Sequence, residues 1–584
     1  MLIKNRTISS EFSGIIILLN LPAFILFYEA GILNVLSYFS AVTSLWVLVF
    51  QFPFLYFIYR NQKSIVTVIR KNLYRLELFF FVFPLFVTIL YLSLLYPPNN
   101  WDSMTYHMAR VAHWIQNQSV EYYFSHIDRQ NIMNPGAEFL ILIPQIIFQS
   151  DIFANLIQSI SWAYCILLIF MIGSMFHANI NQKLFAVVFA ASIPMGILQA
   201  TSTQNDLVAS VFCLSIIGNH FLLKKLLERT DFPEHKWILL LSYSISIFSA
   251  YLAKPTTIIF AFFFILSSIF HLGKYFLRKE ERVNIVENIK LFFISILIGL
   301  VILGPDVYRK YKQSGSLTGN RSEIFSSEDD FEIRFANSLK GMFYHSPVSS
   351  LCETDVYDYL NLKTGNPYKT KQTDVCTNVY QFNEDYIGNP IQFSIVLFFC
   401  FIQLFFRLKK KKKDHSELFI GICLSWFFFH FMVKDQPWIS RLQLPFFYSS
   451  ALLVFALPEI NFRKFRFLFY LPILFMIAQS WMTLASNVNR PFVLFGKSFA
   501  REWHYFNGKS EIRFLYSSFV DYVKKNKIKD VGLALHGDSW DYPLTWQLTQ
   551  IGVRVSHVDL LYPIVLRYWM VIVSSCKGRA FLYF

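Results

Sequence analysis

The sequence PPNNWDSMTYHMARVAHWIQNQSVEYYFSHIDRQNIMNPGAE, residues 97–138, is a polar, aromatic-rich stretch in a chain otherwise built of long apolar runs. A polar break of this length predicts a large loop outside the lipid bilayer, where chemistry can be placed. If residues 101–116 form a helix, successive residues turn by about 100°. One face then carries the polar side chains Asp102, Tyr106, Arg110 and His113. The sequence therefore predicts an amphipathic helix on the membrane surface with its acid-base groups exposed.

The composition indicates a polytopic membrane protein. Of 584 residues, 54% are hydrophobic and 16% are charged, and the mean hydropathy is +0.41. Ordinary soluble domains carry about 25% charged residues, so that class is excluded. The net charge of +15 comes from short clusters between apolar runs, not from one continuous basic stripe, which disfavours nucleic-acid binding.

Thirteen apolar runs are long enough, or nearly so, to span a bilayer as helices. These are 13–30, 38–59, 76–96, 152–175, 184–200, 206–225, 237–253, 256–273, 288–305, 391–407, 417–433, 443–458 and 467–487. Counting the spans alternately places every cluster of Lys and Arg on one side. These clusters are 60–75, 224–236, 274–290, 407–413 and 463–466. The positive-inside rule makes that side cytoplasmic, together with the amino terminus.

We therefore expect an integral protein of the bacterial cytoplasmic (inner) membrane with an uncleaved amino-terminal anchor. The exterior side receives the loops 97–137 and 306–390 and everything after residue 487. The run 139–149 is too short to span and contains Pro144, so we expect it to lie in the membrane interface.

Beyond residue 490 the pattern changes to that of a small soluble unit. The spacing of apolar residues predicts a helix over 511–526, and short apolar runs predict strands at 531–535, 553–559 and 569–575. The predicted fold is thus an all-α polytopic membrane domain, 1–490, of about 13 transmembrane helices. A small α/β exterior (periplasmic) domain, 491–584, follows it.

Two of the seven cysteines, Cys352 and Cys376, share a polar loop, and an oxidising exterior would allow a disulfide between them. Four others lie in apolar runs and are interpreted as small hydrophobic residues: Cys165, Cys213, Cys400 and Cys423. No cysteine pair has zinc-ligand spacing, so we expect no metal or other cofactor from these residues.

An enzyme acting outside the cytoplasm has no access to nucleotide-activated sugars, so a transferase there needs a donor carried in the membrane, such as a polyprenyl-phosphate ester. It also needs a carboxylate to accept the proton of the attacking hydroxyl. Asp102 fits that role, because it begins the predicted surface helix beside Tyr106 and Arg110. The alternative is an ordinary helix-start residue favoured by the helix dipole. His107 and His113 are rival proton carriers or plain surface histidines.

Two basic residues stand alone at the exterior ends of spans, where the positive-inside rule disfavours them. Lys254 lies in YLAKPTT and Arg441 in PWISRLQLP. A lone cation there indicates a partner, and a lipid phosphate is the first candidate. The alternative is that each side chain reaches to ordinary lipid headgroups.

A third exterior span end carries Gln204, Asn205 and Asp206. These residues either cap the following helix or bind sugar hydroxyls. Together with Tyr106, His107, Arg110, Lys254 and Arg441 they complete the candidate substrate-binding set around the candidate base Asp102.

The motifs NWDSMTYHMARVAHWIQNQSVEYY, TSTQNDL, AKPT and QPWISRLQLP, in this order and on one side, resemble the GT-C superfamily of membrane glycosyltransferases. The likeness is greatest to the branch of protein O-mannosyltransferases and lipid A aminoarabinose transferases. It covers about residues 76–460, and the exterior carboxy-terminal domain is also similar to that class.

The resemblance implies inverting transfer of a sugar from a polyprenyl-phosphate donor to a hydroxyl of a lipid, glycan or protein acceptor, with Asp102 as the general base. Many members of the superfamily carry a pair of acids in the first loop, whereas the next acids here are Glu121 and Asp128. This departure gives no support for a divalent metal. The alternatives are a flippase or other transporter of lipid-linked sugars, and a glycan ligase or polymerase that uses a polyprenyl-diphosphate donor. A transporter predicts ionisable residues near the centres of spans.

Overall fold

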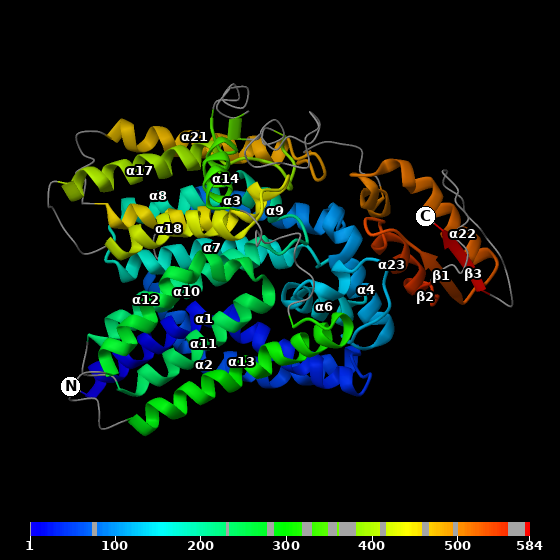
Figure 1. The fold of residues 1–584 in the computed structure, drawn as a ribbon, viewed down its shortest axis with the longest axis horizontal. Helices are drawn as coiled ribbons and strands as arrows, with labels where there is room; N and C mark the ends of the chain where they lie inside the picture. The colour runs from blue at the N-terminus through cyan, green and yellow to red at the C-terminus, as the bar shows by residue number, and fades with distance from the viewer. Residues whose placement is uncertain are drawn as a thin grey trace.

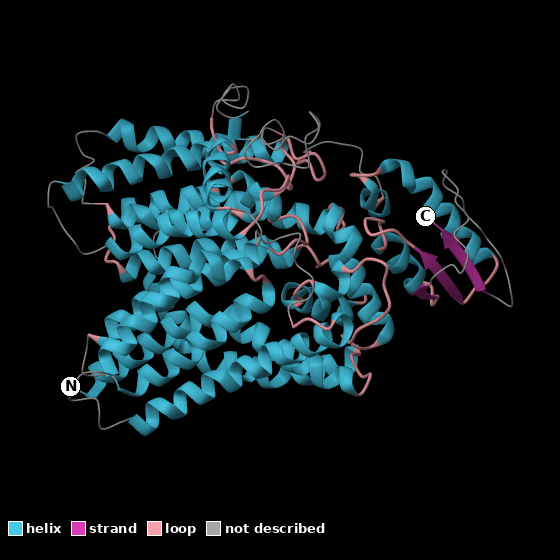
Figure 2. Ribbon diagram, viewed as in Figure 1, coloured by secondary structure: helices cyan, strands magenta, loops and turns pink. Residues whose placement is uncertain are grey.

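The protein, represented by a computed structural model, is a bundle of helices with a small set of strands at its carboxyl end (Figures 1 and 2). The structure describes residues 2–72, 79–228, 233–276, 285–317, 330–347, 359–360, 381–408, 416–457, 466–493, 500–558 and 579–583. In Figure 1 the amino terminus and the carboxy-terminal strands lie at opposite ends of the long axis.

The predicted spans coincide with helices of the bundle. These are α1 (Leu2–Tyr38), α2 (Ser44–Asn72), α3 (Phe79–Leu95), α7 (Leu156–Met175), α8 (Ile180–Ala191), α9 (Pro194–Gln199), α10 (Asp206–Leu227), α11 (Pro233–Ala253), α12 (Thr256–Phe276), α13 (Ile285–Ser314), α17 (Pro390–Leu408), α18 (Ser416–Met432), α20 (Leu444–Ser450), η5 (Ala451–Ala456) and α21 (Arg466–Ala485). In the described part of the chain, five helices are long and apolar enough to cross a membrane, namely α1, α7, α10, α12 and α13. The chain is therefore an α-helical membrane protein.

Helix α10 is the centre of the bundle. It packs against α7, α11, α12 and α20, and 94% of its most apolar 18-residue window is buried. Helix α13 lies at the periphery, and its exposed side chains Phe292, Phe293 and Leu297 are apolar, as expected of a surface that faces lipid.

Two of the predicted single spans are broken in the structure. The run 184–200 forms α8 and α9, which are separated because Pro194 cannot continue the helix but is favourable in the first turn of the next one. The run 443–458 forms α20 followed by a 3-10 helix, η5. Apolar composition alone therefore predicted helix in both places but not its interruptions.

The first polar loop folds into short helices that the bundle and the carboxyl end enclose. A π-helical turn, η2 (Ser103–His107), leads into α4 (Met108–Asn117), followed by α5 (Arg129–Ile132) and α6 (Gly136–Phe148). The expectation of exposed acid-base groups on this segment is wrong for three of the four residues: Tyr106, Arg110 and His113 are buried. The reason is that α6 packs on one side of α4 and α23 (Tyr542–Gln550) packs on another.

The carboxyl end contains a three-stranded parallel sheet of order β2-β1-β3. Its strands are β1 (Asp530–Ala534), β2 (Arg554–His557) and β3 (Arg579–Tyr583), with Val531 opposite Val555 and Ala580. The predicted helix 511–526 is present as α22 (Arg513–Lys525), and β1 and β2 match two predicted strands. The predicted strand 569–575 lies outside the described residues. In the described part of the chain the third strand of the sheet is β3.

The second large loop starts later than predicted, because α13 continues to Ser314 instead of ending near residue 305. The described part of this loop includes α14 (Phe331–Phe343), and α19 (Ile439–Leu442) follows α18 farther along the chain. Cys352 and Cys376 lie outside the described residues. Among the described cysteines, Cys165 and Cys213 are free thiols in the core, as predicted.

Helix α6 begins in direct contact with the end of α11. A Cβ atom added to Gly136 would lie 2.8 Å from the Cα of Ala253. This contact fixes the end of α11, and with it the position of the next residue, Lys254.

Replacement of Gly136 by valine is expected to separate α6 from α11 and to lower the free energy of unfolding by about 1–3 kcal/mol, as overpacking does in other cores. The measurement is the thermal unfolding midpoint in detergent. Gly304→Val is the matched control, because a Cβ at Gly304 meets no atom within 4 Å. Equal midpoints for the two variants would contradict the close contact.

Candidate functional site

Charged side chains from five separate segments meet beside the first loop. Asp102 lies just before η2, Asp206 begins α10, and Lys254 follows α11 directly. Arg441 lies on α19, and Asp385 lies in the segment that precedes α17. Ion pairs join these five residues into one group, which we call the Arg441 cluster.

Arg441 is the centre of this cluster. Its Nη2 atom lies 2.8 Å from Asp102 Oδ2, and its Nη1 atom lies 2.6 Å from Asp385 Oδ1. Its Nε atom lies 3.7 Å from Asp206 Oδ2, too far for a hydrogen bond but within reach of an ion pair. Because only 8% of the Arg441 side chain is exposed, water screens these charges weakly. One guanidinium group thus holds three carboxylates together.

Lys254 binds the same cluster from the other side of Asp206, with its Nζ atom 2.5 Å from Asp206 Oδ1. The isolation of Lys254 and Arg441 in the sequence had predicted a lipid phosphate as their partner. In the structure both have protein carboxylates as partners, which come from segments far away in the chain. The lipid phosphate as a further partner of these cations stays a prediction.

The cluster shifts the pKa values of two of its carboxyl groups in opposite directions. Burial acts to raise the pKa of Asp102, but the positive charges of Arg441 and Arg129 outweigh it, and the pKa lies below its usual value. Burial raises the pKa of Asp385 to about 6, against the opposing charge of Arg441 and with the help of neighbouring acids. Asp102 is therefore ionised at neutral pH, whereas Asp385 takes up a proton as the pH falls through about 6.

A second buried ion pair supports the cluster. Arg490 Nη2 lies 3.0 Å from Glu384 Oε1, and both side chains are fully buried. Arg490 also donates hydrogen bonds to Asn99 and Thr201, so it connects the chain after α21 to the first loop and to the turn before α10. This pair positions the peptide that carries Asp385.

Gln204 belongs to the Arg441 cluster through its amide, whose Nε2 atom donates to Asp385 Oδ1 at 3.0 Å. Its Oε1 atom accepts from Gln199. Asn205 precedes α10, but its side chain makes no capping hydrogen bond to that helix. Of the three candidates in this turn, the structure brings Gln204 and Asp206 to the candidate base.

Three other candidates of the first loop are Tyr106, His107 and Arg110. Tyr106 lies near enough to Asp102 to lower its pKa. The guanidinium carbon of Arg129 lies over the Tyr106 ring, 5.2 Å from the ring centre. His107 Nδ1 lies 2.6 Å from Glu138 Oε1, and Arg110 Nη1 lies 3.6 Å from the same oxygen.

The buried Glu138 is therefore the carboxylate partner of two candidate substrate-binding residues, His107 and Arg110. Arg110 also lines a separate small hollow together with Asp306 and Arg309. His107 and Arg110 thus pair with Glu138 inside the packed loop.

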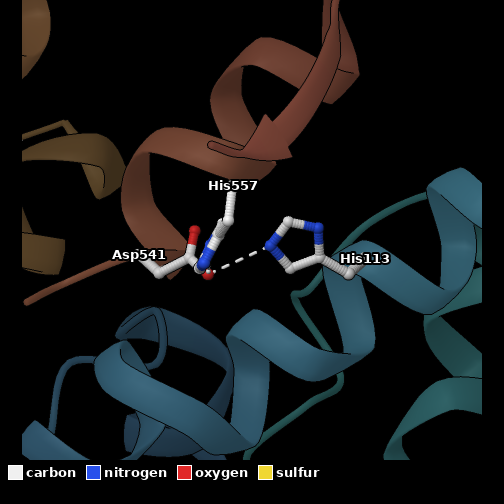
Figure 3. Close-up of side chains that lie close together, drawn as sticks. All are labelled: His113, Asp541 and His557. Carbon is white, nitrogen blue, oxygen red and sulfur yellow. Dashed lines mark hydrogen bonds and ion pairs between the residues drawn. The ribbon is translucent and has the colours of Figure 1, made fainter. Parts of the chain in front are cut away.

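His113 belongs to a different group of side chains, which joins the loop to the carboxyl end (Figure 3). His113 Nε2 and His557 Nε2 each lie 3.0 Å from Asp541 Oδ2. Gln130 Nε2 donates to the same oxygen at 2.8 Å, and Thr545 donates to the other oxygen of Asp541. Burial acts to raise the pKa of Asp541, but the two imidazole groups hold it well below its usual value. We call this group the Asp541 latch.

The latch has the residue types and spacing of a metal site. The hydrogen bonding does not fit an ion, however, because the backbone N–H of His126 donates to His557 Nδ1 at 3.2 Å. That bond places the ring proton of neutral His557 on Nε2, whereas coordination through Nε2 needs a free lone pair there. The geometry therefore favours a buried carboxylate held by hydrogen-bond donors.

Sequence reasoning missed Asp385, Glu384 and Arg490. Arg490 satisfied the criterion that had selected Lys254 and Arg441, since it is a lone basic residue after the predicted span 467–487. Glu384 and Asp385 are adjacent acids, but no local pattern shows that a cation on α19 meets them.

The Asp541→Ala variant is expected to weaken the docking of the carboxyl end. It leaves three buried N–H donors without an acceptor, and we expect a loss of about 3 kcal/mol of unfolding free energy. Thermal unfolding and limited proteolysis between α21 and α22 are the measurements. Asp538→Ala is the control, because Asp538 is an exposed acid of the same loop whose ion pair with Arg129 is worth less than about 1 kcal/mol. Equal effects of the two variants, or loss of stability of the wild type on addition of a chelator, would contradict this account of the latch.

Comparison with protein-family models and with curated proteins finds no match to this chain. The resemblance of its motifs to the GT-C superfamily therefore stays an expectation drawn from the residues, and the function is argued from the geometry of the Arg441 cluster.

Proposed function

We propose that this protein is a membrane glycosyltransferase that moves a sugar from a polyprenyl-phosphate donor to a hydroxyl acceptor, with inversion at the anomeric carbon. The observation that supports it most is the ion pair between the candidate base Asp102 and Arg441, whose atoms lie 2.8 Å apart. Asp206 pairs with both Arg441 and Lys254 and so brings the second cation to the same place. Such a reaction needs a carboxylate and phosphate-binding cations at one place.

Asp102 has the charge state that a general base needs. It is ionised at neutral pH, and 14% of its side chain is exposed, so an acceptor hydroxyl can reach it. The hydroxyl would give its proton to Asp102 while its oxygen attacks the anomeric carbon of the donor. The lowered pKa makes Asp102 a weaker base, so the transfer depends on strong stabilisation of the departing group.

Arg441 and Lys254 are proposed to supply that stabilisation. As the sugar–phosphate bond breaks, negative charge gathers on the phosphate oxygens of the polyprenyl phosphate. Cations that are already fixed in a weakly screened site stabilise this charge without reorganising at the moment of reaction. The ion pairs with Asp102 and Asp206 fix Arg441 in this way.

The placement of the charges supports transfer over transport. Asp206 lies at the first residue of α10, Lys254 lies directly after α11, and Arg441 lies on the short helix α19. A transporter would carry its ionisable groups midway along the spans. A ligase that uses a diphosphate donor has no specific support in this geometry.

The proposed orientation follows the positive-inside rule. The amino terminus would lie in the cytoplasm, and the Arg441 cluster and the carboxy-terminal strands would lie outside. The donor phosphate would then sit at the outer boundary of the bilayer. The acceptor, whether lipid, glycan or protein, would approach from the exterior.

The Asp102→Asn variant is expected to lower kcat by a factor of at least about 100 in reconstituted membranes, because asparagine accepts no proton. Turnover of a panel of polyprenyl-phosphate sugars, followed by mass spectrometry, is the measurement. Asp128→Asn is the matched control, since Asp128 is an exposed acid of the same loop and makes no capping hydrogen bond. Wild-type turnover by a folded Asp102→Asn protein would refute the assignment, as would consumption of no donor by the wild type.

A further inference from the structure

We propose that Asp385 occupies the position on Arg441 that the donor phosphate takes when it binds. Asp385 gives up this ion pair by taking up a proton. This inference rests on the proposed function and adds a positioning residue to it. It explains how an anionic donor can bind to a cation that three carboxylates already hold.

The charge balance of the cluster opposes a further anion. Asp102, Asp206 and Asp385 bring three negative charges when ionised, and Arg441 and Lys254 bring two positive ones. A phosphodiester would add another negative charge in a weakly screened site, where like charges repel strongly. Protonation of one carboxyl group removes this repulsion.

The hydrogen bonds of Arg441 lead to the same requirement. Its Nη2 atom is engaged by Asp102 and its Nη1 atom by Asp385, and its Nε atom faces Asp206. A phosphate oxygen therefore gains an Nη hydrogen bond from this guanidinium only where a carboxylate gives one up.

Asp385 is the carboxylate most easily displaced. Asp206 has a second cation, Lys254, at 2.5 Å and is only 2% exposed, so it is held firmly. Asp102 has to stay ionised as the base. Asp385 is 21% exposed, and its other side-chain hydrogen bond comes from the neutral amide of Gln204.

The groups that face Asp385 set the sign of the pH dependence. Asp102 and the adjacent Glu384 raise its pKa together with burial, and Arg441 lowers it, with the result near 6. When Arg441 pairs with a phosphate instead of Asp385, its positive charge no longer lowers the pKa of Asp385, so this pKa rises further. At neutral pH the donor-bound form then carries a proton on Asp385 that the free form lacks. Donor affinity should consequently fall as the pH rises above about 6.

The test measures binding of farnesyl methyl phosphate, a lipid phosphodiester whose single negative charge does not change between pH 5.5 and pH 7.5. The full chain is used in nanodiscs of zwitterionic lipid. We expect wild-type affinity to fall on the order of 20-fold between these pH values, because one proton is taken up on binding. Asp385→Asn should bind with nearly the same affinity at both, close to the wild-type affinity at pH 5.5. The control Asp128→Asn should keep the wild-type slope.

The outcomes separate this inference from the proposed function. Wild-type binding without a pH slope, or an Asp385→Asn protein that keeps the slope or binds more weakly, would overturn the role of Asp385 and leave the donor class standing. Absence of binding by every variant at both pH values would overturn both. In turnover, Asp385→Asn should lower KM for the donor at pH 7.5 and change kcat little, whereas a purely structural role would lower kcat.

Discussion

The guanidinium group of Arg441 is the interaction on which the rest of the site depends. Three carboxylates from distant segments, Asp102, Asp206 and Asp385, lie around it. Without a cation between them, buried acids at this spacing would repel one another and take up protons. The planar fork of arginine can contact two of them at once, which the point charge of lysine does less well. Arg441 therefore determines both the geometry and the protonation of the cluster.

The helix bundle supplies the fixed positions from which these side chains converge. Helix α10 is buried along its length and presents Asp206 at its first residue, while the contact of Gly136 with Ala253 fixes the end of α11 and hence Lys254. Breaks in helices matter as well. The end of α9 and the turn that follows it place Gln204 beside Asp385. The site thus lies where helices begin and end, at the edge of the apolar interior.

Local sequence patterns predicted where helices and strands lie better than they predicted which segments lie next to each other. Apolar runs located the helices because burial in lipid needs continuous apolar length, and two lone cations were found because they violated the positive-inside rule. The same rule would have found Arg490. The helical period of 101–116 correctly grouped Asp102 with Tyr106, but a polar face has the same pattern whether water or a folded domain covers it. The burial of α4 under α23 and the contact of Asp385 with Gln204 depend on segments far away in the chain, and a local pattern does not contain that information.

The carboxyl end lies close enough to the candidate base to be part of the same site. Trp540 contacts Trp101 edge to face at 5.7 Å between ring centres, and Arg129, which lies over Tyr106, donates to the carbonyl oxygen of Gly537 at 3.0 Å. The Asp541 latch holds this loop against α4. Tyr106 in turn lies near Asp102, so the contacts of the carboxyl end extend to the surroundings of the candidate base. The bundle provides the cations and the carboxyl end encloses the first loop, so the geometry around Asp102 depends on both parts of the chain being docked together.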